Sequence, residues 1–313
     1  MDALASLLDG PRARGAFLLR LMLGPPWSLR IEDQAPLALI VMVKGDAWVV
    51  PDHADAVQLR PGDVAVLRGP NPLTFADAPD TQPQVVIHPG QRCTNLKGED
   101  LAESMSLGMR TWGNCLDGPT MILTGVYQMP GEIGRRILAA LPELVVLAEE
   151  QWDDHLIPLL REEIGKDAPG QEAVLDRLLD LLLIAVLRDW FSRTEANAPA
   201  WYRAQADPVV GRALRLLHNN PAHSWTLTGL AAETFVSRAA LARRFKDLVG
   251  EPPMAYLTNW RLSLAIDLLR DPTATISQVA AQVGYSSPFA LSTAFKRIHG
   301  LSPKAHRSLA ATT

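Results

Sequence analysis

An internal repeat near the C-terminus constrains the fold of this chain more than any other feature of its sequence. Residues 226–246 have the sequence TLTGLAAETFVSRAALARRFK, and residues 275–296 have the sequence TISQVAAQVGYSSPFALSTAFK. The first halves of the two copies align at an offset of 49 residues and the second halves at 50, so one extra residue lies in the second turn. The aligned pairs are Leu230 and Val279, Ala231 and Ala280, Ala232 and Ala281, Leu241 and Leu291, Phe245 and Phe295, and Lys246 and Lys296.

Each copy of the repeat predicts two helices joined by a turn. The first helix carries small side chains, such as Ala231 and Ala232, which let a second helix cross it closely. The second helix has Leu and Phe four residues apart, a spacing that places both on one inward face. In a helix-turn-helix motif of this kind, the second helix lies in the major groove of DNA. The expected N-caps are Thr228 and Ser277 for the first helices and Ser237 and Ser287 for the second helices, and Pro288 falls at a first helical position.

A long helix is expected between the two copies. Residues 253–270 place Leu257, Trp260, Leu264 and Leu268 on one face. A rigid helix at this place would fix the separation of the two recognition helices. Because successive major-groove faces recur at roughly 34 Å, the two copies could contact adjacent turns of one duplex.

The charge of the chain is divided unevenly along its length. The formal net charge is −4, but residues 1–206 carry −10 and residues 207–313 carry +6. The basic part begins at Asp207-Pro208, an N-cap followed by proline that predicts the start of a helix. A basic segment that contains both repeats is a candidate for binding a polyanion. The alternative, chance variation of surface charge, explains the asymmetry equally well.

The N-terminal half is expected to consist mainly of β-strands. Short apolar or alternating segments are punctuated by Gly, Pro and Asp, which favours a sandwich or a small barrel. Residues 89–110 are polar and predict a long loop. The spacing then becomes helical in residues 132–141, 154–165 and 171–193, and a linker follows at 194–199. The expected strands are Phe17–Leu23, Leu37–Lys44, Ala47–Val50, Asp63–Leu67 and Met121–Tyr127.

The helix expected at residues 171–193 has a broad apolar stripe. Such a stripe is buried either against its own domain or against a partner helix, and the periodicity favours neither. The longest apolar run, residues 181–187, is too short to span a bilayer. The N-terminus has no apolar segment typical of a signal peptide, so we expect a cytoplasmic protein that does not associate with membranes.

Residues 207–310 resemble the DNA-binding domain of AraC/XylS-type transcription regulators, which contains two helix-turn-helix motifs. The chain departs from the family pattern at Phe235, where the first turn often has Gly or a small residue. The resemblance rests on an ordered set of features, namely the first repeat, Gly250-Glu251-Pro252-Pro253 with Tyr256, Arg261-Leu262 with Ala265, residues 276–281, Gly284-Tyr285-Ser286-Ser287, Phe289, Phe295-Lys296 and Gly300-Leu301-Ser302-Pro303.

The resemblance implies which side chains face DNA. Arg243 is the best candidate for contacting a base, because a guanidinium can bond guanine bidentately. The implied positions are Arg238, Ala239, Ala242 and Arg243 in the first recognition helix and Ser287, Pro288, Ser292 and Thr293 in the second. Candidates for phosphate contacts are Arg244, Lys246, Lys296 and Arg297, with a solvated surface charge as the alternative for each.

The N-terminal part resembles the cupin-like regulatory domain of the same family. The resemblance rests on residues 4–20, on the strand Leu37–Val43 followed by Gly45, and on residues 59–64, LRPGDV. It implies a sensor or a dimerisation module. Cupin enzymes usually hold a metal with clustered His and Glu, whereas this chain has no His-x-His and only His53 and His88 in the expected barrel. We therefore expect no enzyme activity, no metal and no cofactor.

Two features of the N-terminal part are candidates for sensing a signal. Cys93 and Cys115 could form a redox switch, because the neighbouring Arg92 would lower a thiol pKa; the alternative is two inert thiols. A small apolar or aromatic effector is the commoner theme of the family. Candidate residues for lining its cavity are Trp27, Met42, Trp48 and Trp112, although in a small barrel such side chains also simply fill the core.

The sequence therefore predicts a multidomain α+β protein. It would comprise an N-terminal cupin-like β-barrel (1–130), a helical dimerisation segment (131–198) and a C-terminal all-α domain with two helix-turn-helix motifs (199–313). The expected function is sequence-specific transcription regulation controlled by a small-molecule effector or a redox signal. The expected partners are double-stranded DNA, RNA polymerase, a second copy of the chain and the effector. The alternatives are a cupin-type enzyme fused to a DNA-binding domain and an effector-independent recruiting protein.

Overall fold

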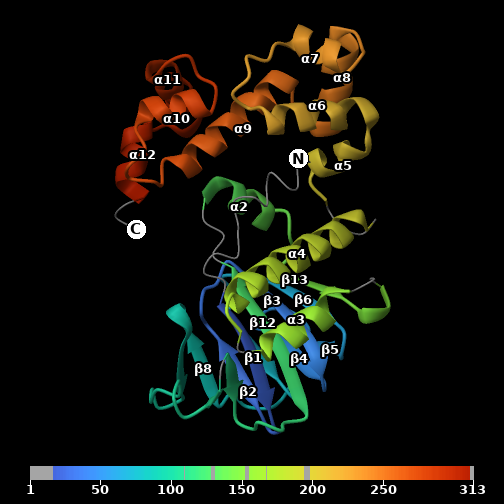
Figure 1. Ribbon diagram of the computed structural model, residues 1–313, viewed down its shortest axis with the longest axis vertical. Coiled ribbons are helices and arrows are strands. Elements are labelled where there is room, and N and C mark those ends of the chain that lie inside the picture. Colours follow the sequence, from blue (N-terminus) through green and yellow to red (C-terminus); the bar gives the residue numbers. More distant parts are fainter. Residues whose placement is uncertain are drawn as a thin grey trace. The chain divides into compact units, whose positions relative to one another are not determined.

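The computed structural model describes residues 17–108, 110–127, 131–151, 155–166, 168–193 and 198–310. These residues form two compact units (Figure 1). The sheet unit contains the described parts of residues 11–129 and 141–196. The helical unit contains the described parts of residues 130–140 and 197–313. Part of the expected linker, residues 194–197, lies outside the described residues.

The sheet unit contains two β-sheets. One has seven strands in the order β10-β11-β1-β12-β3-β6-β13, and the other has six in the order β5-β4-β7-β2-β8-β9. A 3-10 turn, η1 (Pro89–Gln91), leads into β9. The strands are β1 (Phe17–Leu23), β2 (Ser28–Ile31), β3 (Leu37–Lys44), β4 (Ala47–Pro51), β5 (Val57–Leu59), β6 (Val64–Arg68), β7 (Leu73–Ala76), β8 (Val85–His88), β9 (Arg92–Asn95), β10 (Ser106–Gly108), β11 (Thr111–Gly113), β12 (Thr120–Tyr127) and β13 (Leu144–Leu147).

The five strands predicted from apolar patterns are all present, two of them with identical bounds. The prediction of a long loop at residues 89–110 is wrong, because this segment contains β9 and β10. Strand β9 lies at an edge of its sheet, where it pairs with β8 and makes a single bridge to Asp100. Its sequence, RCTN, has one fully buried side chain, Thr94. A short edge strand of polar residues carries no apolar periodicity that a sequence pattern could reveal.

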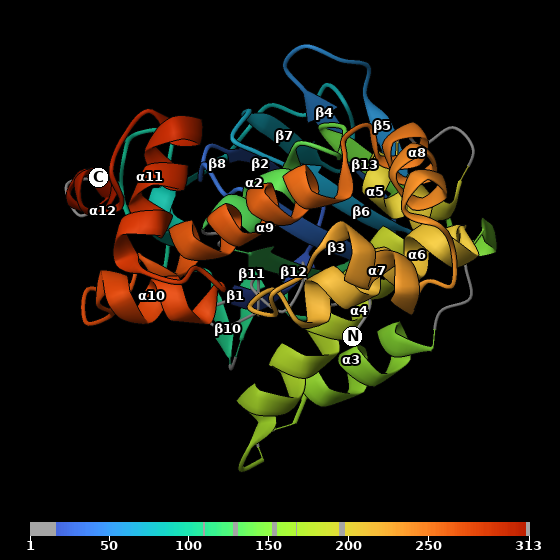
Figure 2. The same cartoon turned by 90° about the horizontal axis from the view of Figure 1, so that it is seen from above.

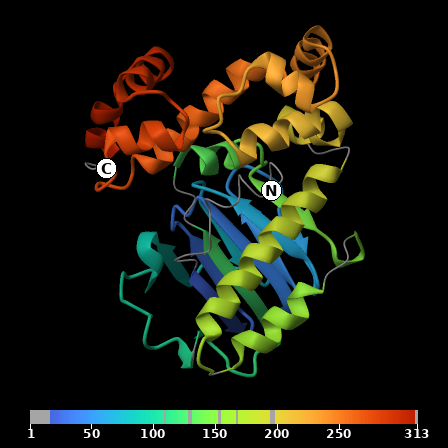
Figure 3. The same ribbon diagram turned by 45° about the horizontal axis from the view of Figure 1, so that its top comes forward.

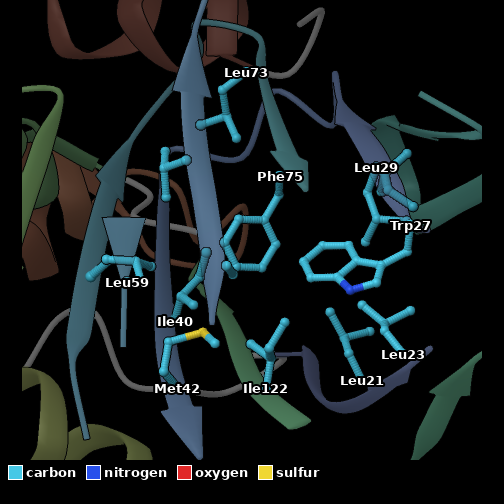
Figure 4. Packing of buried hydrophobic residues seen from close by; sticks show 14 of the residues in the cluster. Leu21, Leu23, Trp27, Leu29, Ile40, Met42, Leu59, Leu73, Phe75 and Ile122 are labelled. Carbon is cyan, nitrogen blue, oxygen red and sulfur yellow. The ribbon is translucent and has the colours of Figure 1, made fainter. Parts of the chain in front are cut away.

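The core of the sheet unit lies between the two sheets (Figure 4). The seven-stranded sheet contributes Leu21 and Ile122, and the six-stranded sheet contributes Leu29 and Phe75. Trp27, just before β2, packs against Phe75 with its ring centroid 5.5 Å away in an edge-on arrangement. The alternating apolar residues of the two inner faces thus explain why these strands stack as layers.

Two helices, α3 (Leu156–Ile164) and α4 (Gln171–Ser192), pack against each other in the sheet unit, after the turn η2 (Glu149–Gln151) (Figure 3). Gly125 of β12 allows the close approach of Leu179, and the hydroxyl of Tyr127 donates to the Leu179 carbonyl at 2.9 Å. The apolar stripe of α4 is buried within the chain at Leu175, Leu179, Leu182 and Val186. Internal packing therefore accounts for this stripe.

The helical unit includes one helix from the middle of the chain. Helix α2 (Gly131–Leu138) lies in sequence between β12 and β13 but packs on α9, where the Glu132 amide donates to Asp267 Oδ1 at 2.7 Å. The other elements are α5 (Ala200–Arg203), η3 (Ala204–Ala206), α6 (Pro208–Asn219), α7 (Leu227–Glu233), α8 (Arg238–Val249), α9 (Pro253–Leu268), α10 (Ile276–Gln282), α11 (Pro288–His299) and α12 (Pro303–Ala310).

Helix α9 runs between the α6–α8 helices and the α10–α11 helices (Figure 2). It contributes side chains to two separate apolar clusters. Tyr256 and Leu257 pack with α6, α7 and α8, whereas Leu262 and Ile266 pack with α10 and α11. Each helix pair thus has its own core. At 1.5 Å per residue, α9 spans about 24 Å, and it forms the helix that the sequence predicts between the two repeats.

Candidate nucleic-acid interface and internal cavity

Helices α8 and α11 begin in the same way. Ser237 accepts a hydrogen bond from the Ala240 amide at 3.2 Å, and Ser287 accepts one from the Ala290 amide at 3.1 Å, so both predicted N-caps are confirmed. Each cap satisfies a backbone donor that the first helical turn leaves unpaired. Each helix also buries its Leu and Phe completely. The opposite face of its first turns is consequently directed to solvent.

The caps of the preceding helices lie two residues earlier than predicted. Thr226 caps α7 and accepts from the Gly229 amide at 3.0 Å, in place of the expected Thr228. Thr275 caps α10 in place of Ser277 and forms a reciprocal capping box with Gln278. The spacing Thr-x-x-Gln was the available sequence signal, because the side chains at the cap and at the third helical residue bond each other's backbone.

The predicted positions of α8 share one outward face. Arg238, Ala239 and Arg243 are exposed and Ala242 is half-buried. Residues three or four positions apart are neighbours on a helix surface, so Ala242 lies next to Arg238 and Ala239, and Arg243 lies next to Ala239. Among the described residues no carboxylate forms an ion pair with Arg243. Its guanidinium is therefore available to a ligand on this face.

Arg244 has a partner inside the unit. Its Nη2 lies 2.6 Å and its Nε 2.8 Å from Oδ2 of Asp207, whose other carboxylate oxygen accepts from the amides of Val209 and Val210. Asp207 is thus the predicted N-cap of α6, and Arg244 joins that cap to α8. The neighbouring Lys246 is exposed, as are Lys296 and Arg297 near the end of α11.

Helix α11 presents an exposed aromatic side chain that is not among the DNA-facing positions implied by the family resemblance. Phe289, the second residue of α11, has 81% of its surface exposed. Pro288 and Thr293 are exposed beside it, and Ser287 and Ser292 are half-buried. The repeat offset of 50 residues would have identified Phe289, because it aligns with Ala239, a selected position of α8.

The two turns require the same backbone conformation. Gly284 has φ +81° and Phe235 has φ +58°, in the left-handed region that favours glycine. Phe235 is 82% exposed, and the Arg212 guanidinium lies 5.2 Å from the centre of its ring. Although Phe235 departs from the family pattern, the backbone of the first turn thus adopts the same left-handed conformation as the second turn at Gly284.

The sheet unit has a cavity of about 260 Å³ between its sheets that is partly open to solvent. Its walls are mostly aliphatic and aromatic, and its polar lining groups are Asp33, Gln91, Cys93 and Thr124, together with the indole of Trp112. Of the four predicted lining residues, Trp112 lines the cavity, while Trp27 and Met42 pack in the surrounding core. Trp48 is half-buried on β4 and is not among the described residues that line the cavity.

The two cysteines are free thiols. Burial, followed by the Asp100 carboxylate, raises the pKa of the Cys93 thiol to about 11. The expectation that Arg92 lowers this pKa is wrong, because successive side chains of a strand point to opposite faces: Arg92 is exposed while Cys93 faces the cavity. The Cys93 thiol donates to the Gln91 carbonyl at 3.5 Å.

Histidine and carboxylate side chains do not gather into a metal-ligating group in the part of the chain that the structure describes. His88 Nε2 lies 2.9 Å from the Thr94 hydroxyl, an ordinary hydrogen bond within the sheet. None of the described helices is both long and apolar enough to cross a membrane.

The chain is similar to known proteins over nearly its whole length. The family model described as cupin matches residues 2–192, and that described as a helix-turn-helix domain matches residues 230–308. A protein of Streptomyces lividans named as an AraC-like transcription regulator is 30% identical, with 98% of each chain covered. The HTH-type transcriptional regulator AlkR of Acinetobacter baylyi is 27% identical over 98% of this chain and 99% of its own.

Among solved structures, the DNA-binding domain of AdpA, a global transcriptional factor in complex with a target DNA, is 29% identical. The match covers 33% of this chain and 93% of that chain, with a TM-score of 0.32. The cupin model alone covers more than half of the chain, and the relatives extend over both units. The chain therefore belongs to the AraC-like transcription regulators, DNA-binding proteins with an N-terminal cupin domain and a C-terminal helical helix-turn-helix domain.

Proposed function

We propose that this regulator recognises specific sequences of double-stranded DNA through two helix-turn-helix motifs, α7–α8 and α10–α11. The observation that carries the proposal is the matching construction of α8 and α11. Both begin at a serine cap, bury Leu and Phe and expose the opposite face of their first turns. Helix α9 joins their separate cores, so one chain presents two recognition helices at a fixed separation.

The exposed side chains divide into base-contacting and phosphate-contacting groups. Arg243 is assigned to a guanine edge, and Ala239, Ala242 and Phe289 are assigned to apolar contacts such as thymine methyl groups. The other exposed or half-buried residues of the proposed DNA-binding faces of α8 and α11 are Arg238, Ser287, Pro288, Ser292 and Thr293. Lys246, Lys296 and Arg297 are assigned to phosphates, whereas Arg244 acts through Asp207 by holding α8 against the start of α6.

We further infer that a small apolar molecule bound in the cavity of the sheet unit controls DNA binding. The support is a cavity of about 260 Å³ with a predominantly apolar lining, close to the lower size limit of typical ligand pockets. The raised pKa of Cys93 favours this mode of control over the redox alternative. The barrel closed by the two sheets would then be the sensor, and a second copy of the chain and RNA polymerase remain the proposed protein partners.

Helix α2 offers a route from the cavity to the DNA-binding helices. It follows β12, whose Ile122, Thr124 and Val126 line the cavity, and it packs on α9. A shift of β12 on ligand binding would act on α2 through the chain itself. The rigid connection between the two recognition helices would thereby respond to the effector.

Selection of DNA ligands by the full-length chain tests the proposed function. The protein is incubated with a random duplex library, and the enriched sequence is compared with a scrambled duplex in gel-shift titrations at several salt concentrations. We expect at least about a thousandfold preference for the enriched sequence. Equal affinities with a steep salt dependence would show non-specific binding to phosphates and contradict sequence recognition.

A further inference from the structure

The loop between α6 and α7, residues 220–225, belongs to the first helix pair but also contacts the second. Its own hydrogen bonds make it a compact turn: the Trp225 indole donates to the Asn220 carbonyl at 2.9 Å, and the Trp225 amide donates to the His223 carbonyl at 2.7 Å. The ring centres of His223 and Trp225 lie 4.3 Å apart in an edge-on arrangement. The loop therefore offers carbonyl groups at defined positions to the elements that pack on it.

Arg261 binds this loop from the middle of α9. Its Nε donates to the Pro221 carbonyl at 2.7 Å, and its Nη2 donates to the His223 carbonyl at 2.7 Å. The planar fork of a guanidinium can hold two such oxygens at once. Arg261 stands in sequence between Leu257, which packs in the core of the first helix pair, and Leu262, which packs in the core of the second. It thus ties the loop to α9 where the helix passes from one core to the other.

The second helix pair contacts the same loop through its turn. Gly284 packs so closely on Ala222 that a Cβ at position 284 would lie 2.6 Å from Ala222 Cα and 2.7 Å from the Ala222 carbonyl oxygen. The next residue, Tyr285, is half-buried, and its ring centre lies 5.9 Å from the guanidinium carbon of Arg261. A guanidinium is attracted to the negative face of an aromatic ring. The loop, the middle of α9 and the second turn therefore meet at one place.

This meeting point restrains the angle between the two helix pairs. Each core packs on its own part of α9, so bending of this helix would turn one recognition helix relative to the other. The contacts of the loop with Arg261 and Gly284 bridge the two pairs outside the helix backbone and resist this bending. Two recognition helices on one duplex must match both the distance along the groove and the rotation around it. Restraint of their angle therefore bears directly on the DNA that they fit.

We propose that Arg261, residues 220–225 and Gly284 form a clamp that fixes the orientation of α8 relative to α11 and thereby selects DNA with one spacing between two half-sites, the segments that these helices contact. The proposal rests on the proposed recognition of DNA by both motifs. Arg261 is a positioning residue, because it bonds backbone carbonyls while other side chains contact the bases. Spacing then adds to the specificity that the base contacts provide.

Duplexes that differ only in spacing test this proposal. Single-base substitutions locate the half-sites in the DNA selected by the full-length chain. Insertion of one base pair between them then shifts one half-site by about 3.4 Å and rotates it by about 35° relative to the other. Gel-shift titrations with both duplexes give the spacing preference of the parent protein, Arg261→Ala, Arg261→Lys and Arg307→Ala, and circular dichroism shows that each variant is folded.

Arg307→Ala is the matched control for the clamp. The Arg307 guanidinium, on α12, also donates to two backbone carbonyls, those of Leu269 at 3.2 Å and Ala274 at 2.6 Å. Both carbonyls lie in the connection between α9 and α10, on the side of the second helix pair. The control therefore removes a similar pair of bonds without releasing the loop between α6 and α7.

We expect the parent protein and Arg307→Ala to prefer the selected spacing at least about tenfold, and Arg261→Ala to reduce this preference to about threefold or less. Arg261→Lys should lose the preference as well, because one ammonium group on a flexible stem does not reproduce the fork. An unchanged preference in Arg261→Ala would overturn the clamp. A full preference in Arg261→Lys would show that charge alone suffices, and an equal loss in Arg307→Ala would show general destabilisation; each would also overturn it.

A distance measurement without DNA separates failure of the clamp from failure of DNA recognition. Leu248 of α8 and Ile298 of α11 are 39% and 43% exposed, so spin labels can be attached to Leu248→Cys and Ile298→Cys after Cys93 and Cys115 are replaced by serine. Pulsed electron paramagnetic resonance should give one narrow distance distribution for the parent protein and for Arg307→Ala, and a broader one for Arg261→Ala. An equally narrow distribution in Arg261→Ala would overturn the clamp whether or not the chain recognises specific DNA.

Discussion

Arg243 of α8 and Lys296 of α11 are exposed side chains of the two proposed recognition helices, and we propose that Arg243 contacts a base and Lys296 a phosphate. Arg243→Ala should cost about 1–3 kcal/mol at the selected site and relax the preference at one base pair. Lys296→Ala should weaken binding evenly across sequences and reduce the salt dependence. Gel-shift titrations with single-base variants of the site distinguish the two effects. Unchanged affinity and unchanged preference in Arg243→Ala would refute its assignment.

Phe289 is exposed at the start of α11, whose first six residues carry no charge, and we propose that it makes an apolar contact with a base. Phe289→Ala should weaken binding to the selected site, and the loss should be larger for thymine than for uracil at the contacted position, because uracil lacks the 5-methyl group. Ile298→Ala is the control, since Ile298 is a half-exposed apolar residue near the other end of the same helix. Equal losses for thymine and uracil duplexes would show that Phe289 does not contact the methyl group.

The raised pKa of Cys93 predicts a slow thiol. With a pKa of about 11, the thiolate fraction at pH 8 is about a hundredfold smaller than that of a thiol with the ordinary value near 9. The rate of alkylation of a Cys115→Ser variant by iodoacetamide should therefore rise with pH until about pH 11. A rate at pH 8 that equals the rate of an exposed cysteine peptide would contradict this prediction and restore the redox hypothesis.

At the scale of single elements, the second turn tolerates less change than the end of α8. A Cβ at Gly284 would lie 2.6 Å from Ala222 Cα, whereas a Cβ at Gly250 would meet nothing, and both glycines have positive φ. Gly250→Ala should destabilise the protein by about 1–2 kcal/mol through its backbone conformation. Gly284→Ala should cost about 2–5 kcal/mol, because the loop at Ala222 must also move. Thermal unfolding of the two variants measures the difference, and equal costs would show that the loop yields freely.

The elements that the sequence predicts well are those whose own periodicity determines them. Strands β1 and β3 have an apolar inner face, and α9 contributes apolar residues to two cores. The apolar periodicity of these elements is therefore easily recognised in the sequence. Strands such as β9 and β10 form through pairing with distant strands, a contribution that a local pattern does not contain. The candidate DNA-binding face followed from the repeat together with the family resemblance. The cavity lining combines side chains from strands of both sheets, so its prediction required the topology.

At the scale of the whole molecule, the boundaries between functional parts differ from divisions of the sequence. Residues 131–198 were expected to form one helical segment, but α2 packs in the helical unit while α3 and α4 pack in the sheet unit. Neither periodicity nor composition distinguishes these helices, because the partner of an amphipathic face is set by tertiary contacts. The chain enters the helical unit at α2 and then returns to the sheet unit, and for this reason we propose α2 as the route from the cavity to α9.

The proposed dimer depends on the outer face of α4. Val174 and Leu181 are 44% and 50% exposed at a spacing of seven residues, and an ion pair between Arg177 and Asp180 lies between them. A face with apolar groups and charges of both signs suits a two-fold contact with a second copy of itself. Leu181→Glu should raise the dimer dissociation constant at least about tenfold in sedimentation experiments.

Leu96→Glu is the matched control for the dimer, because Leu96 is 70% exposed on the sheet unit outside α3 and α4, and its substitution should leave association unchanged. A parent protein that sediments as a monomer at all concentrations would refute the dimer. The affinity of Leu181→Glu for duplexes with one or two copies of the selected site then shows whether a single chain or a dimer is needed to read one site. Suppose that Leu181→Glu lowers the affinity only for duplexes with two sites. The two helix pairs of one chain then read a single site, and the dimer holds two chains on two neighbouring sites. The dimer would raise the affinity through effective concentration, without new base contacts.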